Sequence, residues 1–196
     1  METVYNFING KQVASKGTKA WPIYNPATGE QIRQVMMSTP EEVNEAVEVA
    51  HAAFPGWAAT SPLRRARVLF KFKELLQRDW DSLARLITEE HGKVYSDSCG
   101  ELTRGLEVVE FACGIPHLLK GEFSEQAGRG IDIHSTMQPL GVTVGITPFN
   151  FPAMVPMWMF PIAIACGNTF ILKPAKADPS LSMRLAELLK EAGLPD

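Results

Sequence analysis

Two short β-rich runs enclose one apolar helical run in the last third of the chain. The β-rich runs are residues 141–146 and 169–173, and the apolar run between them covers residues 153–165. Strands that are buried on both faces read as continuous apolar segments, and a strand, a crossover helix and a parallel strand form a right-handed βαβ unit. The pattern therefore predicts an α/β fold whose parallel sheet starts at residue 141.

A further helix is predicted directly after this unit. Asp178 has the chemistry of an N-cap, Pro179 suits the first helical position, and Gly193 followed by Pro195 marks the end. The sequence stops where a third parallel strand is expected. Two parallel strands alone leave apolar surface uncovered, so we expect the natural protein to continue or partners to cover this surface.

The N-terminal region predicts two β-hairpins. Residues 7–13 turn at Asn9-Gly10, a pair that accepts the positive φ angles of a tight turn, and residues 24–35 turn at residues 27–29. We expect these hairpins to form an N-terminal β flap.

Three helices are predicted between the flap and the parallel sheet. The first opens with Thr39 as N-cap, Pro40 at the first helical position and Glu42 in the capping-box position. Its apolar face is predicted to contain Val43, Ala46, Val47, Ala50 and Phe54.

The second helical stretch starts at Ser61-Pro62, runs to about residue 90 with a break near residues 80–81, and closes at Gly92. The third is predicted to begin near Ser98, with Glu101 in a capping-box position. A loop over residues 121–130 follows. In residues 131–136, Ile131, Ile133 and Ser135 alternate with Asp132, His134 and Thr136, which is typical of a half-exposed strand. Such an edge could pair within an oligomer or be solvated.

Composition and charge exclude several classes of protein. A net charge of −3 and a pI near 5.8 give no basic field for nucleic acid or an anionic membrane surface. The apolar segment 149–166 contains three prolines and is slightly short for a membrane span. The three cysteines show no metal-ligand spacing, and the N-terminus shows no leader sequence, so we expect no metal and a cytoplasmic location.

The chemistry is predicted at the carboxyl ends of the two parallel strands, where open α/β sheets bind their ligands. Residues 147–152, TPFNFP, follow the first strand, and residues 173–176, KPAK, end the second. The Gly-x-Gly-x-x-Gly fingerprint of dinucleotide binding is not among them.

These two loops, in this order and spacing, resemble the aldehyde dehydrogenase superfamily. The resemblance extends over nearly the whole chain and includes the segments NPATGE at 25–30, PLGV at 139–142, GNT at 167–169 and AGLP at 192–195. Residues 147–156, residues 158–161 and the run at 103–112 are similar to the methylmalonate-semialdehyde dehydrogenase branch.

The resemblance implies an aldehyde dehydrogenase-like fold in three parts. Residues 1–130 would hold the β flap and the helical part of the cofactor domain, residues 131–140 an oligomerisation strand, and residues 141–196 the start of a Rossmann-like NAD-binding sheet that is incomplete in this chain. A homo-oligomer, either a dimer or a tetramer, is implied by the same likeness.

The resemblance also implies a mechanism. A cysteine thiolate attacks the semialdehyde, hydride passes to NAD, and coenzyme A takes the acyl group from the thioester with loss of the substrate carboxylate as carbon dioxide. Asn150 would donate its side-chain N–H to the oxyanion. The competing interpretation is that Asn150 only caps the helix that starts at Ala153.

Arg104 matches an arginine that holds the substrate carboxylate in that branch, a task suited to a planar bidentate donor. The alternative is a surface arginine paired with Glu101 or Glu107. One methyl group is worth little binding energy, so malonate and methylmalonate semialdehyde are not distinguished.

The cofactor residues implied by the resemblance are Thr147, Phe149, Lys173, Lys176 and Ala177. Lys173 would hydrogen-bond the adenosine ribose. Glutamate is usual in the family where Lys176 stands, and an ammonium cannot accept hydrogen bonds from ribose hydroxyls, so tolerance of NADP is a hypothesis.

None of Cys99, Cys113 and Cys166 has the sequence context of the family nucleophile. The chain alone is therefore expected not to oxidise an aldehyde. A non-catalytic nucleotide-binding or assembly module with the same fold is the alternative function. A flavodoxin-like phosphate binder ranks last because no Gly- or Ser-rich phosphate loop follows the first strand.

Overall fold

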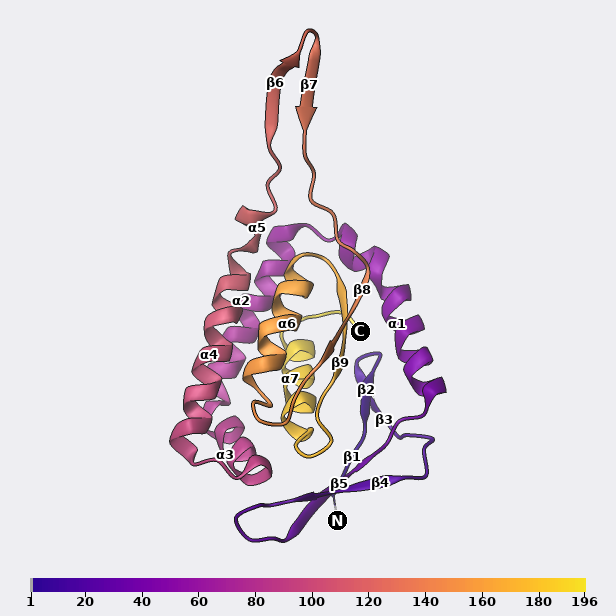
Figure 1. The fold of residues 1–196 in the computed structure, drawn as a ribbon, viewed down its shortest axis with the longest axis vertical. Coiled ribbons are helices and arrows are strands. Elements are labelled where there is room, and N and C mark those ends of the chain that lie inside the picture. The colour runs from indigo at the N-terminus through magenta and orange to yellow at the C-terminus, as the bar shows by residue number, and fades with distance from the viewer. Residues whose placement is uncertain (1) are drawn as a thin grey trace.

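The computed structural model describes residues 2–196, and their N-terminal part forms the predicted β flap (Figure 1). Strands β2 (Asn6–Ile8) and β3 (Lys11–Val13) pair antiparallel around Asn9 and Gly10, whose φ angles are 53° and 65°. Strands β4 (Ala20–Tyr24) and β5 (Gln31–Met36) form the second predicted hairpin. Strand β1 (Glu2–Val4), which the sequence pattern missed, pairs parallel with β5.

Four long helices follow the flap. They are α1 (Pro40–Ala59), α2 (Pro62–Arg78), α3 (Trp80–His91) and α4 (Tyr95–Cys113), and a short α5 (Ile115–Leu118) extends the last. The capping box of Thr39 and Glu42 is formed as predicted. The predicted break near residue 80 separates α2 from α3, and Gly92 ends α3 with a φ of 85°.

Two helix predictions need correction. α4 begins at Tyr95 rather than near Ser98, since the backbone N–H groups of Asp97 and Ser98 already donate to the Val94 carbonyl. The Ser98 hydroxyl is buried and lies 3.0 Å from Thr88 Oγ1. Glu101 belongs to no capping box of α4, since its carboxylate reaches the start of a later helix. The predicted apolar face of α1 is also less buried than expected, with Val43 and Val47 exposed.

The βαβ unit is present as predicted. β8 (Val142–Ile146) and β9 (Thr169–Lys173) are parallel and in register from Val142↔Thr169 to Ile146↔Lys173. α6 (Met154–Ala165) connects them and packs against α4, while α1 lies against both strands. In residues 2–196 no helix is long and apolar enough to cross a membrane.

The last helix, α7 (Ser180–Glu191), starts one residue later than predicted. Pro179 is its N-cap, and the Asp178 carboxylate accepts no hydrogen bond from a protein group. The backbone N–H of Ser180 instead donates to Glu90 Oε2 at 3.1 Å. Asp178 is therefore not the cap that the sequence suggested.

The main hydrophobic core joins α2, α3, α4, α6 and α7. Its fully buried side chains include Phe72, Leu76, Leu83, Leu102, Met157 and Leu185. Gly105 lets α4 approach α6 closely, because a Cβ at this position would lie 2.2 Å from Met157 Cε. The core thereby fixes α6 and the loop before it against α4.

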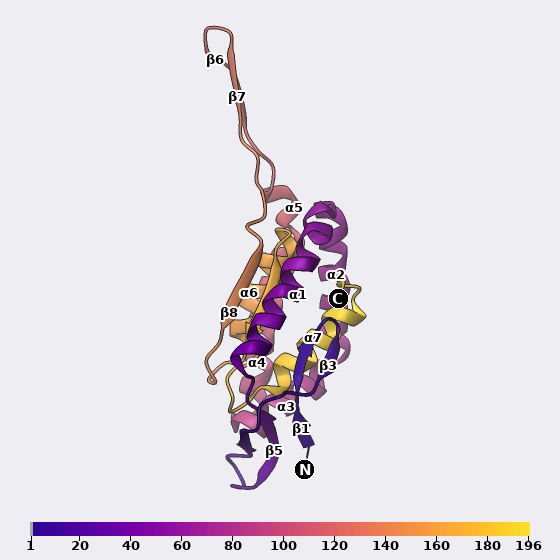
Figure 2. The same ribbon diagram turned by 90° about the vertical axis from the view of Figure 1, so that its right-hand side faces the viewer.

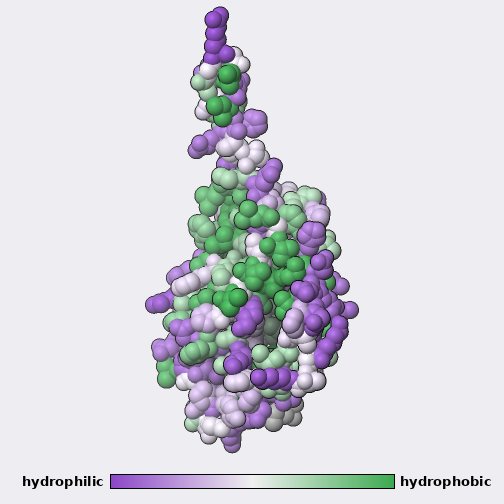
Figure 3. Space-filling view, turned by 45° about the vertical axis from the view of Figure 1, so that its right-hand side comes forward, coloured by the Kyte–Doolittle hydropathy of each residue, from purple (hydrophilic) through white to green (hydrophobic). Residues whose placement is uncertain are grey.

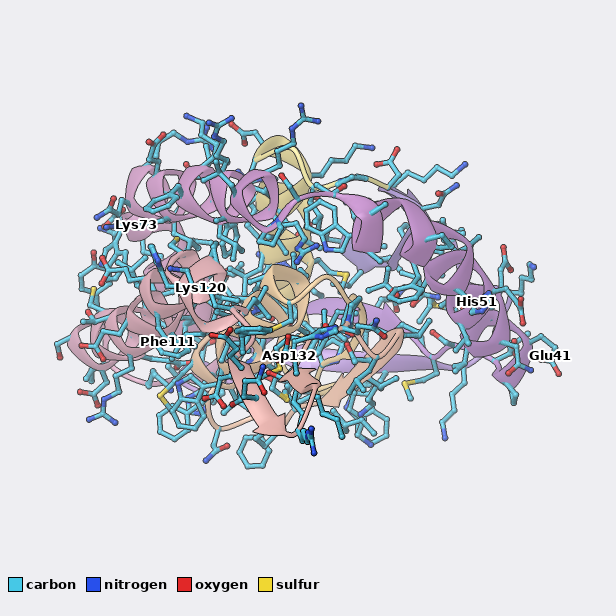
Figure 4. The ribbon with its side chains drawn as sticks, turned by 90° about the horizontal axis from the view of Figure 1, so that it is seen from above. Glu41, His51, Lys73, Phe111, Lys120 and Asp132 are labelled. Atoms are coloured by element: carbon cyan, nitrogen blue, oxygen red, sulfur yellow. The ribbon has the colours of Figure 1, made fainter. Side chains whose placement is uncertain are left out.

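A hairpin of β6 (Phe123–Gly128) and β7 (Ile131–His134) stands away from the body (Figures 1 and 2). The predicted loop over residues 121–130 therefore contains a strand. All four residues of β7 are exposed, rather than every second one, because no part of residues 2–196 covers either face of the hairpin. Figure 4 looks down on this projection: Asp132 lies over the middle of the body, between α1 with Glu41 and α4 with Phe111.

Candidate functional site

The carboxyl ends of β8 and β9 bring the two predicted loops together. The backbone N–H of Thr147 donates to the carbonyl of Lys173 at 3.2 Å, which extends the parallel ladder by one step. The Thr147 side chain is buried, and the loop of residues 147–152 then leads into α6. The structure therefore confirms that both loops lie at one edge of the sheet.

Asn150 does not cap α6. The first amides of the helix, those of Ala153 and Met154, donate to Glu101 Oε1 at 2.6 and 3.1 Å. The Asn150 residue is exposed, and its side-chain amide has no partner within residues 2–196. The capping interpretation of Asn150 is wrong, and its side chain is free to bind a ligand.

A buried ion pair holds the backbone of the Asn150 loop. Lys93 Nζ lies 2.6 Å from Glu101 Oε2, and the side chains of Lys93 and Glu101 are only 10% and 1% exposed. The same Lys93 ammonium donates to the backbone carbonyl of Asn150 at 3.0 Å and lies 4.6 Å from the centroid of the Phe151 ring.

Phe149 is exposed beside this loop and stacks on His91. The ring centroids are 6.4 Å apart, with 25° between the planes. Burial lowers the pKa of His91, and the neighbouring charge of Lys93 lowers it further. The lowered pKa favours the neutral form of the imidazole that stacks on Phe149, next to Asn150 in the chain.

The second loop presents two lysines with different surroundings. Lys173 is exposed at the end of β9, and its side chain has no partner within residues 2–196. Lys176 Nζ lies 3.2 Å from the centroid of the Trp21 ring, on β4 of the flap. Ala177, also exposed, follows it.

This second loop lines a large apolar groove of about 670 Å³. Its walls come from α1, α7, β2 and β9, and they include the predicted α1 face at Val43 and Val47. Figure 3 shows hydrophobic surface across the middle of the body, where β8 and α1 come forward. Val144 and Ile146 on β8 are exposed there.

Arg104 is exposed on α4, one residue before the close contact of Gly105 with α6. It forms no ion pair within residues 2–196, and Glu101 is engaged with Lys93 and α6. The alternative that Arg104 pairs with Glu101 or Glu107 is therefore not found. Its guanidinium is free for an anionic ligand.

A buried carboxyl lies behind the site. Both oxygens of Asp178 are buried without a hydrogen-bond partner among protein groups. Burial, reinforced by the negative charges of Glu90 and Glu101, raises the pKa of Asp178 to about 7.

Burial disfavours the reactive thiolate form of two of the three cysteines. All three are free, and burial raises the pKa values of the Cys113 and Cys166 thiols. A thiol is a nucleophile only as thiolate, so these two are poor candidates. No cluster within residues 2–196 has three or more side chains placed to hold a metal ion.

The fold is an α/β domain in which two loops meet at the carboxyl ends of the parallel strands β8 and β9. The aldehyde dehydrogenase family model matches residues 13–196, so the chain belongs to that family.

The chain is similar to particular members over its whole length. It is 53% identical to malonate-semialdehyde dehydrogenase of Pseudomonas aeruginosa over 195 residues, which are 100% of this chain and 39% of that protein. A malonate-semialdehyde dehydrogenase of Bacillus anthracis is also 53% identical, over 99% of this chain and 40% of that protein. The chain thus spans about 40% of the length of these relatives.

Solved structures show the same likeness. A Sinorhizobium meliloti protein, described as a methylmalonate-semialdehyde dehydrogenase and solved with NAD, superposes with a TM-score of 0.97 at 55% identity, over 100% of this chain and 40% of that one. An NADP-dependent enzyme of Escherichia coli superposes at 0.94 with 31% identity, over 99% and 40% of the two chains. The predicted fold is confirmed.

Sequence reasoning missed three residues at this edge. Glu101 was assigned to a cap of its own helix, and Lys93 and Trp21 carried no signal. Each acts on a partner more than 50 residues away. Local pattern rules cannot show such contacts.

Proposed function

We propose that this chain forms the N-terminal part of a NAD-dependent, CoA-acylating dehydrogenase of malonate or methylmalonate semialdehyde. The observation that carries the proposal is the exposed side-chain amide of Asn150, which caps no helix and has no partner within residues 2–196. Lys93 and Glu101 hold the backbone from Asn150 to the start of α6. The similarity to semialdehyde dehydrogenases over the full chain supports it.

In this proposal the chain supplies the electrostatic part of the reaction. A cysteine thiolate outside residues 1–196 adds to the aldehyde carbon, and the carbonyl oxygen becomes an oxyanion. The Asn150 N–H donates to that oxygen, and such a preorganised donor contributes about 3 kcal/mol to the transition state. Loss of hydride leaves a thioester, which coenzyme A cleaves, and the substrate carboxylate leaves as carbon dioxide.

Arg104 has the role of substrate anchor. Its guanidinium is exposed and unpaired, and a planar donor pair matches the carboxylate of a semialdehyde. An uncharged aldehyde offers no such contact, so Arg104 favours semialdehydes.

The residues at the end of β9 fit a dinucleotide. Bound NAD or NADP would supply the hydride acceptor. The free ammonium of Lys173 can donate to a ribose hydroxyl, while Thr147 and Phe149 form the adjoining wall. Neither Lys176 nor Ala177 is acidic, so neither would repel the 2′-phosphate of NADP. The Lys176 ammonium, which lies over the Trp21 ring, would attract it. NADP use is consistent with this arrangement, and relatives solved or named with either cofactor support both.

We also propose that the complete protein is a cytoplasmic homo-oligomer, a dimer or tetramer, assembled through the β6–β7 hairpin. The hairpin carries exposed apolar side chains at Phe123, Ile131 and Ile133, which a second subunit would cover.

The direct test is product analysis with the complete protein. We expect malonate semialdehyde, NAD and CoA to give acetyl-CoA, carbon dioxide and NADH, with the thioester product strictly dependent on CoA. Formation of free malonate in place of acetyl-CoA would refute the acylating assignment. Absence of any NADH would favour the non-catalytic alternative.

A further inference from the structure

We propose that Lys93 and Glu101 are positioning residues that set the place of the Asn150 amide and hence the rate of the reaction. The inference rests on the proposed function, because it concerns the donor that function requires. Neither residue touches the aldehyde in this account. Both act through the loop at residues 150–154.

Lys93 and Glu101 bind the backbone of the segment 150–154 at two places. Lys93 Nζ holds the carbonyl of Asn150 at 3.0 Å, and Glu101 Oε1 holds the amides of Ala153 and Met154 at 2.6 and 3.1 Å. Lys93 Nζ and Glu101 Oε2 also form an ion pair with each other, at 2.6 Å. The Asn150 carbonyl and the amides of Ala153 and Met154, which all follow the Asn150 Cα in the chain, are thus tied to one ion pair.

The charges favour this arrangement. The N-terminus of α6 carries the positive end of a helix dipole, which the Glu101 carboxylate stabilises. Lys93 balances that buried carboxylate, and its ammonium also lies over the Phe151 ring. Because the side chains of Lys93 and Glu101 are nearly inaccessible to water, solvent hardly screens the attraction between their charges.

The structure contains a matched pair with no link to Asn150. Glu90 on α3 is equally buried and accepts from the first amide of α7, that of Ser180, at 3.1 Å. Glu90 is paired with Arg33, whose Nη1 lies 3.2 Å from Glu90 Oε1. The two glutamates therefore do the same structural task for α6 and α7, but only one of them is tied to the Asn150 loop.

The test is a double-mutant cycle in the complete protein, with kcat, NAD affinity and melting temperature measured for each variant. We expect Lys93→Met to lower kcat by about 10- to 100-fold, the loss typical of a misplaced catalytic group, while NAD affinity is unchanged. In an Asn150→Ala background, Lys93→Met should lower kcat by less than about threefold, because the group it positions is gone. Arg33→Met should lower the melting temperature without this loss of kcat.

Three outcomes separate the possibilities. The positioning role is refuted if Lys93→Met leaves kcat unchanged. It is also refuted if Lys93→Met lowers kcat by the same factor in the Asn150→Ala background as in wild type. If wild-type protein oxidises no semialdehyde, or Asn150→Ala is fully active, the proposed function itself fails. Should Lys93→Met not fold, Lys93→Gln, which is one atom shorter and uncharged but can still donate to Glu101, serves in the same cycle with the same expectation.

Discussion

At the scale of single residues, the site consists of donors that lack protein partners. The side chains of Asn150, Arg104 and Lys173 are exposed and unpaired within residues 2–196, while Lys93 and Glu101, which hold the Asn150 loop, are buried and paired with each other. Asn150 and Lys173 lie on the two loops at one edge of the sheet, and Arg104 lies on α4. In the proposed function these donors bind an oxyanion, a ribose and a carboxylate, respectively.

Arg104 gives the first prediction at this scale. In the complete protein, Arg104→Met should raise KM for malonate semialdehyde about 10- to 100-fold, the worth of a charge-assisted hydrogen bond. KM for propanal, which lacks the carboxylate, should change little. Arg67→Met, an exposed arginine on α2, is the control. Equal effects of Arg104→Met on both aldehydes would contradict the anchoring role.

Asp178 gives a prediction about pH. Its pKa is raised to about 7 in the folded chain, so the folded state binds its proton more tightly than the unfolded state does. This contribution to stability is complete below about pH 4, the ordinary carboxyl value, and is lost as the pH rises through about 7. Asp178→Asn should therefore stabilise the protein at pH 8 by on the order of 2 kcal/mol and by little at pH 4.

The measurement is denaturant unfolding of wild type and Asp178→Asn across this range. Asp97→Asn, at an exposed position on α4, is the matched control. A difference between wild type and Asp178→Asn that stays constant from pH 4 to pH 8 would show that Asp178 does not titrate as described.

At the scale of elements, the β6–β7 hairpin is the part least explained by the rest of residues 2–196. Its apolar residues are exposed on both faces, and a two-stranded hairpin alone is marginally stable in water. Replacing both Ile131 and Ile133 by lysine should reduce the oligomer of the complete protein to smaller species in sedimentation experiments. Leu63→Lys, a similarly exposed apolar residue on α2, should not. An unchanged sedimentation coefficient would exclude the hairpin from the interface.

Local signals predicted most elements but not their long-range contacts. Three features depend only on residues close together in the sequence, and all three were predicted: the turn at Asn9-Gly10, the capping box at Thr39 and the end of α3 at Gly92. Strand β6 was missed because its composition is polar, and Asp178 was mistaken for a cap because the Glu90 carboxylate lies 88 positions earlier in the sequence.

At the scale of the whole molecule, the proposed function gives this chain one side of an active site. Its sheet has two parallel strands, the β8 surface is exposed at Val144 and Ile146, and its length is about 40% of that of similar enzymes. The family match gave the sequence its functional interpretation, since composition and periodicity lead only to an α/β domain with a ligand edge. The roles of Asn150 and Arg104 came from that likeness, and the structure adds that both side chains are available.

The isolated 196-residue chain should form no NADH from malonate semialdehyde. Burial raises the pKa of the Cys113 and Cys166 thiols, and this effect outweighs the opposite effect of the neighbouring Lys73 and Arg65 charges. Stopped assays with a sensitive NADH readout, with the complete protein as positive control, check this. Turnover that disappears on replacing one of the three cysteines by serine would contradict the assignment of the nucleophile elsewhere.

The central claim is that Asn150 stabilises the oxyanion, and single-turnover hydride transfer in the complete protein tests it most directly. NADH formation should be about 100- to 1,000-fold slower in Asn150→Ala than in wild type, at saturating NAD and semialdehyde, with the affinity for NAD unchanged. A rate of NADH formation in Asn150→Ala equal to that of wild type would contradict the claim.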